Sequence, residues 1–281
     1  MSLTGITAYL RPGTLEEALT LLNERALFVA GGTDVIRHPH LGVTTLVGLG
    51  ALPLRYIRHD RGFAVGATAT LTDMLEHPGL AGHLDGVIAG MLHGVASPLL
   101  RNAATIGGHL ARGRYSDVVP VLVALDATIT LFDGTERTLP LASYYQGGLH
   151  RSRSLITEVG IPAAGADTAA AFLKFTRTSF DFALLNCAVR VRLGGEGDVA
   201  ECRIAVGETP GLGAPVEPAA AALLGGPLED DRIAAAAAIA AEAIPAQDDQ
   251  RASADYRRAL CRVGLRRCLA EARRRFEERR A

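Results

Sequence analysis

The feature that most constrains this chain is a pair of adjacent glycines at the end of a short apolar run, Phe28-Val29-Ala30-Gly31-Gly32-Thr33-Asp34-Val35. The apolar residues predict a buried strand. Two residues without a Cβ let the backbone adopt positive φ and approach a ligand closely. Consecutive N–H groups in such a turn form a concavity that holds an anion, typically a phosphate. A single Gly-Gly-Thr-Asp sequence is more often an ordinary tight turn, so it does not assign a ligand by itself.

A second glycine pair changes this balance. The stretch Ala104-Thr105-Ile106-Gly107-Gly108-His109-Leu110 repeats the order of hydroxyl, apolar residue, two glycines and polar residue. We expect a second glycine turn here, and two such turns suit a ligand with two phosphates. Neither stretch contains G-x-G-x-x-G leading into a helix, and neither is followed by G-K-[ST]. The sequence therefore argues against a Rossmann site and against a P-loop.

Composition excludes several classes of function. The chain has 281 residues with a net charge of -1, which argues against a general nucleic-acid surface. Its four cysteines, Cys187, Cys202, Cys261 and Cys268, are scattered without a C-x-x-C, so we expect buried thiols and no metal or iron–sulfur site. No apolar run reaches membrane-spanning length and no basic-then-apolar leader is present, so we expect a soluble, cytoplasmic protein.

Lysine usage is strongly biased. Lys174 is the only lysine, and every other basic side chain except histidine is arginine. Genomic composition that favours arginine codons explains this bias without any functional role. The other explanation is that position 174 requires a compact ammonium rather than a planar guanidinium. The residues alone leave both explanations open.

Periodicity and capping signals predict two domains. The first would span residues 1–165, with lobes of about 1–53 and 54–165 and a single helix over 80–95 in the second lobe. A linker over 163–169 leads to a second domain, 170–281. There we expect three antiparallel strands at 171–178, 183–193 and 199–206. Three alanine-rich helices would follow at 217–224, 230–243 and 253–278.

Taken together, these features resemble the medium, FAD-binding subunit of the molybdenum hydroxylases, the family of xanthine dehydrogenase and aerobic carbon monoxide dehydrogenase. The resemblance covers essentially the whole chain. It implies an α+β fold, in which a two-lobed FAD-binding domain of the vanillyl-alcohol-oxidase type precedes a small domain with a three-stranded antiparallel sheet and three helices. It rests on Ala30–Asp34, on Thr105–Gly108 with Ser116, Asp117 and Pro120, on Phe172–Lys174 with Arg177, Asp181, Ala183 and Ala188, and on Tyr256–Arg258 with Arg266 and Arg267.

The resemblance also implies residue roles around a non-covalently bound FAD. Phe28 to Val35 would wrap the pyrophosphate with backbone amides, and Ala104, Thr105 and Gly108 would hold the phosphates and the ribityl chain. Ser116 and Asp117 would meet the adenosine ribose, Ile156 would lie near the flavin ring, and Lys174 would approach the ring from the second domain.

Two departures from the family pattern lie beside this predicted site. The family usually has asparagine after the second glycine pair, where this chain has His109. The loop from Leu110 to Ser116 is one residue shorter than usual and carries Arg112 and Arg114, which either pair with phosphate or are solvated.

The resemblance implies an electron-transfer subunit without catalytic residues of its own. Substrate would be oxidised in a large molybdopterin subunit, and a small subunit with two [2Fe-2S] clusters would relay electrons to the FAD, which passes them to an external acceptor. Two alternatives remain open from the sequence: an independent flavin oxidoreductase, and a structural subunit that has lost FAD.

Overall fold

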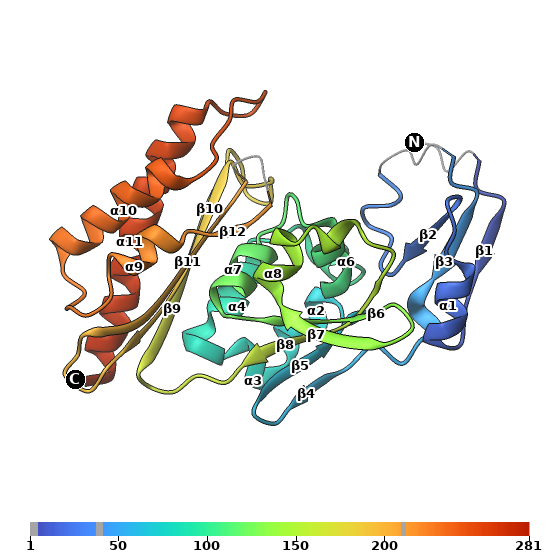
Figure 1. Ribbon diagram of the computed structural model, residues 1–281, viewed down its shortest axis with the longest axis horizontal. Helices are drawn as coiled ribbons and strands as arrows, with labels where there is room; N and C mark the ends of the chain where they lie inside the picture. The colour runs from blue at the N-terminus through green and yellow to red at the C-terminus, as the bar shows by residue number, and fades with distance from the viewer. Residues whose placement is uncertain (1–4, 38–41, 209–211, 281) are drawn as a thin grey trace.

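A computed structural model describes residues 5–37, 42–208 and 212–280. Three β-sheets follow one another along the long axis of the molecule (Figure 1). Among the helices in these ranges, none combines the length and hydropathy that a membrane span requires.

The N-terminal sheet positions the first glycine pair. Its three strands are parallel, in the order β1 (Ala8–Leu10), β3 (Thr45–Gly48) and β2 (Ala26–Val29). Helix α1 (Leu15–Leu21) begins where the Thr14 hydroxyl accepts a hydrogen bond from the Glu17 N–H, as its capping sequence predicts. Strand β2 ends two residues before Gly31, so the glycine pair lies at the carboxyl end of a parallel strand.

The middle of the chain is a five-stranded antiparallel sheet covered by helices on one face. The strand order is β4 (Ile57–His59), β5 (Gly62–Gly66), β8 (Leu155–Pro162), β6 (Thr128–Phe132) and β7 (Glu136–Pro140). Alternate residues such as Val65, Val159 and Ile129 are fully buried against the helices. The helices are α2 (Leu71–Glu76), α3 (Pro78–Ala81), α4 (His83–His93), α5 (Pro98–Arg101), α6 (Ile106–Arg112), α7 (Val118–Ala124) and α8 (Leu141–Gln146).

Two sequence predictions in this region are wrong. The helix expected over 80–95 is broken, because Leu84, Asp85 and Gly86 have φ of 49°, 57° and 74°. The carboxylate of Asp85 pairs there with Arg279 of the last helix, and the sequence Asp85-Gly86 is itself typical of a turn. The second glycine pair is also not a turn: it lies in the first turn of α6, where the Thr105 hydroxyl caps the helix by accepting from the Gly108 N–H at 3.2 Å.

The C-terminal sheet has the predicted antiparallel meander with one short additional strand. Its order is β12 (Ala214–Pro215), β11 (Val199–Gly207), β10 (Leu185–Leu193) and β9 (Thr168–Phe175). Strand β9 begins three residues earlier than the sequence suggests. The predicted helices are present as α9 (Glu217–Ala221), α10 (Asp230–Ala243) and α11 (Ala254–Arg280).

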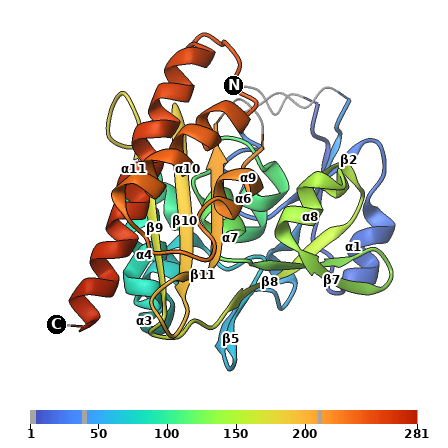
Figure 2. The same ribbon diagram turned by 60° about the vertical axis from the view of Figure 1, so that its left-hand side comes forward.

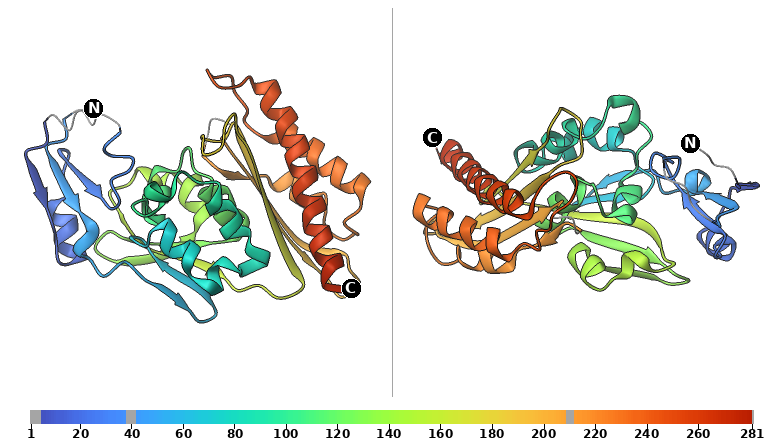
Figure 3. Two further views of the ribbon diagram at one scale, coloured as in Figure 1. Left: turned by 180° about the vertical axis from the view of Figure 1, so that it is seen from behind. Right: turned by 90° about the horizontal axis from the view of Figure 1, so that it is seen from above.

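The C-terminal sheet is packed on both faces, which explains its small apolar residues. Ala169, Ala171 and Cys187 contribute to the core shared with α9, α10 and α11. Ala170 and Ala188 on the other face join the core of the middle region, where α4 and α7 pack against β9, β10 and β11 (Figure 2). Seen from above, the long helices form the outermost layer (Figure 3). Any side chain of β9 or β10 on the inner face therefore points toward α4 and α7.

Candidate functional site

Two cavities lie on either side of the glycine segments. We name the first the leucine cavity; it has a volume of about 320 Å³ and is lined by Leu22, Leu27 and Leu49 together with predicted site residues. We name the second the ion-pair cavity, because Lys174 and Asp117, which form an ion pair, both line it. Its volume is about 380 Å³ and it reaches the C-terminal sheet. Of the predicted site residues, Phe28, Ala30, Gly108 and Ile156 line the leucine cavity, and Thr33, Asp34, Ala104, His109, Asp117 and Lys174 line the ion-pair cavity. Val29, Gly31, Gly32, Val35, Thr105 and Ser116 support these residues without lining either cavity.

The structure gives a different reason for the absence of a side chain at each of the four motif glycines. A Cβ on Gly31 would lie 1.8 Å from the Ala103 carbonyl oxygen, so this glycine lets the two motif segments touch. A Cβ on Gly107 would lie 2.7 Å from the Ala67 carbonyl oxygen, so α6 packs closely on the middle sheet through this residue. Gly32 has a φ of +70°, which a side chain makes costly. Of the four, Gly108 is the exposed one, and a Cβ there would meet only the Thr105 Oγ1, at 3.0 Å. It therefore offers a helix surface that a bound group can approach.

Arg112 joins the two motifs electrostatically. Its guanidinium lies 3.0 Å from the Asp34 carboxylate, so the end of α6 is tied to the first glycine segment. The same guanidinium stacks over the rings of Tyr115 and Phe182, 5.4 and 5.2 Å from their centroids. The alternative that this arginine is only solvated is wrong, because it makes these contacts. Arg112 instead holds together the walls of the ion-pair cavity.

Lys174 is part of a buried hydrogen-bonded group. Its Nζ donates to the Asp117 Oδ2 at 2.6 Å and to the Gly94 carbonyl oxygen at 3.1 Å. Asn186, opposite Lys174 in the β9–β10 register, donates its Nδ2 to the Asp117 Oδ1 at 2.8 Å. The side chains of Lys174 and Asp117 are only 12% and 8% exposed. Both oxygens of Asp117 are therefore held by the C-terminal sheet.

These contacts place two pairs of residues differently from the expected roles. Asp117 was expected at the adenosine ribose and Lys174 at the flavin ring, which are opposite ends of FAD, yet the two side chains touch. Ile156 and Lys174 were both expected at the flavin ring, yet they line different cavities. We therefore propose different roles for these three residues below and keep the residue set unchanged.

His109 lies between the second motif and the following loop. Its Nδ1 shares a hydrogen bond of 3.1 Å with the Ser116 hydroxyl. Burial, with a further contribution from Arg112, lowers the pKa of His109 to about 4. The ring is therefore neutral near pH 7, so it contributes a hydrogen-bonding group rather than a charge, as the asparagine usual in the family would.

The structure adds site residues that carry no sequence signal. Glu208, directly after β11, is 7% exposed and accepts a hydrogen bond from the Ser116 N–H at 3.0 Å. Burial is the main cause that raises its pKa to about 7, and Asp117 adds to the effect. Asn186, Tyr115 and Phe182 also border the site through the contacts given above. A lone Glu after a strand, or an Asn within one, is unremarkable in sequence, and only the pairing of distant segments shows its role.

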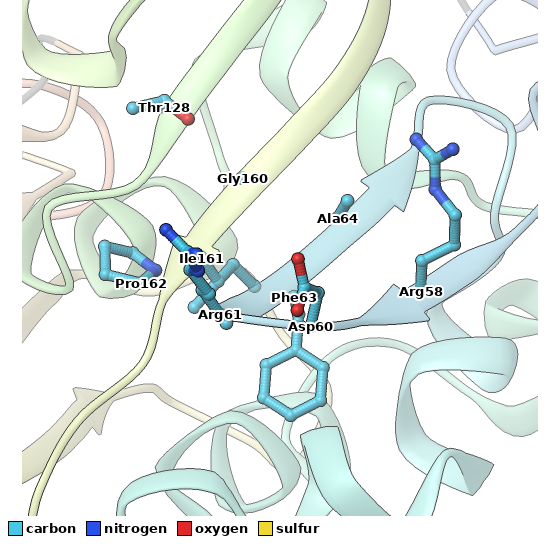
Figure 4. A pocket seen from close by; sticks show the side chains of 10 residues that line it. Arg58, Asp60, Arg61, Phe63, Ala64, Thr128, Gly160, Ile161 and Pro162 are labelled. Carbon is cyan, nitrogen blue, oxygen red and sulfur yellow. The ribbon is translucent and has the colours of Figure 1, made fainter.

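A third pocket is remote from both motifs. It is a hollow of about 530 Å³ on the open face of the middle sheet, where Ala64, Gly160 and Thr128 lie in register on three strands. Figure 4 shows Ala64 and the ring of Phe63 on opposite sides of β5, with Arg58 and Arg61 at the edges of the hollow. No predicted site residue lines it. Within residues 5–37, 42–208 and 212–280, no group of three or more His, Cys, Asp or Glu side chains could hold a metal ion.

Known proteins resemble this chain over nearly its full length. The chain is 29% identical over 276 residues to the nicotine 6-hydroxylase medium subunit of Paenarthrobacter nicotinovorans, covering 94% of this chain and 96% of that one. It is 29% identical over 278 residues to the carbon monoxide dehydrogenase medium chain of Hydrogenophaga pseudoflava, with the same coverage. A solved carbon monoxide dehydrogenase from that organism, which lacks the Mo-pyranopterin moiety of its cofactor, matches with a TM-score of 0.90 and 29% identity over 96% of this chain and 98% of that one.

Two family models divide the chain between them. Residues 4–164 match the FAD binding domain in molybdopterin dehydrogenase, and residues 170–272 match the CO dehydrogenase flavoprotein C-terminal domain. The bare surface of Gly108 and the cavities on both sides of it fit an extended dinucleotide. The α+β fold expected from the resemblance is confirmed. The chain therefore belongs to the FAD-binding medium subunits of the molybdenum hydroxylase family, and it is a subunit of an oxidoreductase whose cofactor is FAD.

Proposed function

We propose that this chain is the electron-transfer subunit of a molybdenum hydroxylase-type dehydrogenase and that its FAD lies across both cavities. The diphosphate would rest on the surface formed by the first glycine segment and Gly108, which separates the cavities. Phe28 to Val35, Ala104, Thr105, Gly108 and His109 remain the residues proposed to hold it. The observation that carries this proposal is that neighbouring residues of the two motif segments line two separate cavities. Ala30 and Gly108 line the leucine cavity, and Thr33, Ala104 and His109 line the ion-pair cavity.

We assign the flavin end to the ion-pair cavity and the adenosine end to the leucine cavity. The mouth of the ion-pair cavity carries Leu100, Tyr115 and Phe180, whose exposed fractions are 43%, 40% and 59%. Exposed apolar residues around a pocket are typical of a surface that another protein covers. A redox ring at this mouth would be accessible to an electron donor on a partner. This orientation keeps Lys174 beside the flavin, moves Asp117 to the same end, and moves Ile156 to the adenosine end.

The bound flavin supplies the redox chemistry, since it takes up electrons and passes them to another acceptor. The protein binds the cofactor, orients it and sets the charge around it. We propose partners of the kinds that the relatives' family implies, a large molybdopterin subunit and a small subunit with two [2Fe-2S] clusters. We also propose residues 1–165 and 170–281 as the two domains. We propose the cytoplasm as the location of the chain, because all four cysteines are free thiols.

A pair of glycine substitutions tests the binding site. In Gly108→Ala a methyl group would occupy the bare face of α6, and a lost charge-assisted hydrogen bond of about 1.5–3 kcal/mol would weaken FAD binding roughly tenfold or more. Gly90→Ala is the control, because Gly90 is also an exposed helical glycine. Nothing lies within 4 Å of its Cβ position, whereas a Cβ on Gly108 would lie 3.0 Å from the Thr105 Oγ1. Titration of the purified full chain with FAD measures both. Equal affinities in folded Gly108→Ala and Gly90→Ala would contradict the assignment.

Co-purification separates this function from an independent flavin enzyme. Expressed in its native host, the tagged chain should bring down a molybdopterin subunit and an iron–sulfur subunit in equal amounts. A yellow chain that purifies alone under mild conditions, and that oxidises substrate without partners, would instead support an independent oxidoreductase.

A further inference from the structure

Three neighbouring strands of the C-terminal sheet direct side chains at one peptide segment, Ser116-Asp117. Lys174 of β9 and Asn186 of β10 hold the two oxygens of Asp117. Asn186 lies opposite Gly207 in the β10–β11 register, and Glu208 is the next residue along the chain. Glu208 accepts the Ser116 N–H at 3.0 Å. Glu208 therefore binds the backbone of this segment, and Lys174 and Asn186 bind the side chain of Asp117.

The loop that ends in this segment depends on being held. Gly113 and Tyr115 have φ of 69° and 49°, and the second value is unfavourable for a residue with a side chain. Backbone in such a conformation persists only where surrounding contacts determine it. Ser116 is 3% exposed, so its N–H has no access to bulk water and needs a protein acceptor. Glu208 provides that acceptor from a different part of the chain.

The same loop carries the contact that orients His109. The Ser116 hydroxyl and the His109 Nδ1 share a hydrogen bond of 3.1 Å, and His109 follows Gly108 directly in α6. His109 lines the ion-pair cavity, whereas Glu208 lines neither cavity. A continuous path of contacts therefore runs from Glu208 through Ser116 to a residue of the proposed FAD site.

We propose that Glu208 is a positioning residue for FAD: by fixing the Ser116 backbone it holds His109 in the orientation that the cofactor meets. The inference rests on the proposed function, because it needs FAD beside His109. Glu208 does not contact the cofactor and acts only through Ser116. Glu208 thereby links the C-terminal sheet to a site whose glycine motifs belong to the rest of the chain.

Substitutions of Glu208 and Ser116 in the full chain test the path, with the dissociation constant for FAD measured by fluorescence titration. Glu208→Gln keeps a carbonyl oxygen for the Ser116 N–H and should bind FAD within about twofold of the parent. Glu208→Ala removes the acceptor and should bind about five- to tenfold more weakly. Glu201→Ala is the control, because Glu201 is a β11 carboxylate paired with Arg192 and lines neither cavity.

The double substitution shows whether Glu208 acts through Ser116. Ser116→Ala removes the hydroxyl that meets His109 but leaves Glu208 and the backbone N–H in place, so it should weaken FAD about as much as Glu208→Ala. Adding Glu208→Ala to Ser116→Ala should then cost little more, since His109 is already released.

Several results would overturn the inference. Parent-like affinity in Glu208→Ala or in Ser116→Ala would do so, as would independent, additive losses in the double variant. Equal losses in Glu208→Ala and Glu208→Gln would also contradict it, because the acceptor atom would then not matter. A parent chain that binds no FAD would overturn the proposed function as well. A parent that binds FAD alongside unaffected variants would overturn only the role of Glu208.

Discussion

Breaking the Lys174–Asp117 ion pair should lower stability and shift the flavin potential in opposite directions for the two partners. Lys174→Met leaves Asp117 charged, nearly buried and held only by Asn186. Removing one partner of a buried pair typically costs 3–5 kcal/mol, and the remaining Asn186 contact favours the lower end, about 3 kcal/mol. A lysine that only approached the flavin ring, as the resemblance implies, would have almost no effect on stability.

The double variant distinguishes the cost of leaving one buried charge unpaired from the cost of losing the ion pair itself. Lys174→Met combined with Asp117→Asn removes both charges together, so its loss in the free energy of unfolding should be smaller than the sum of the single losses. Asp126→Asn is the matched control, because Asp126 follows the other end of α7 and pairs with Arg190 and Arg203 of the same sheet at 2.9 and 2.8 Å. Urea titration of all four variants measures these losses.

The same variants predict a pattern in the two-electron potential of the bound flavin. Lys174→Met leaves a net negative charge and should lower the potential, Asp117→Asn leaves a net positive charge and should raise it, and the double variant should lie near the parent. A shift of about 30 mV corresponds to about 1.4 kcal/mol, so a modest charge effect is measurable by dye-coupled titration. An equal decrease in Lys174→Met and in the double variant would refute the reasoning, because Lys174 would then act as an unpaired cation.

The close contact at Gly31 and the shifted pKa values of Glu208 and His109 each predict a change in stability. Gly31→Ala should destabilise the chain by about 1–3 kcal/mol through its contact with Ala103, whereas Gly90→Ala should stabilise it by up to about 1 kcal/mol; urea midpoints check both. Because burial raises the pKa of Glu208 to about 7, the folded chain binds more protons than the unfolded one above pH 4.5, and this group's contribution to stability falls as the pH rises to 7, by roughly 3 kcal/mol at most. Glu208→Gln should remove that slope, and parallel slopes in the two proteins would contradict it. Because burial lowers the pKa of His109 to about 4, stability should fall as the pH falls from 6.5 to 4, and less so in His109→Asn.

Local sequence signals predicted the elements whose ends are set locally. Thr14 carries the hydroxyl that a helix cap requires and caps α1, and β8 spans Leu155–Pro162, where buried and partly buried residues alternate toward its end. The C-terminal strands and helices were likewise visible from turn residues and apolar periodicity. These predictions succeeded because capping and alternation act over a few residues.

The errors arose where distant segments decide the conformation. The break at Leu84–Gly86 lies where Asp85 meets Arg279, nearly two hundred residues away. The local turn signal Asp85-Gly86 was outweighed in the prediction by the helical spacing of the apolar residues around it. The second glycine pair was expected to form a turn because it repeats the residue order of the first, yet the Thr105 cap makes it the first turn of α6.

The sequence singles out the members of the proposed site but not their arrangement. Both glycine motifs and Lys174 stand out in the sequence, and the structure brings them to neighbouring cavity walls. Their relative placement depends on contacts between distant segments, such as Lys174 with Asp117 and Glu208 with Ser116. A family resemblance supplies roles one residue at a time, so it does not reveal that two of those residues are paired with each other.

The most direct test of the account is the structure of the purified full chain reconstituted with FAD. We expect one FAD per chain, its diphosphate against Gly32 and Gly108, its adenosine in the leucine cavity beside Ile156, and its flavin ring in the ion-pair cavity beside the Lys174–Asp117 pair. A flavin ring beside Ile156 would contradict the orientation. A chain that takes up no FAD, or binds it only in the hollow between Arg58 and Arg61, would contradict the site.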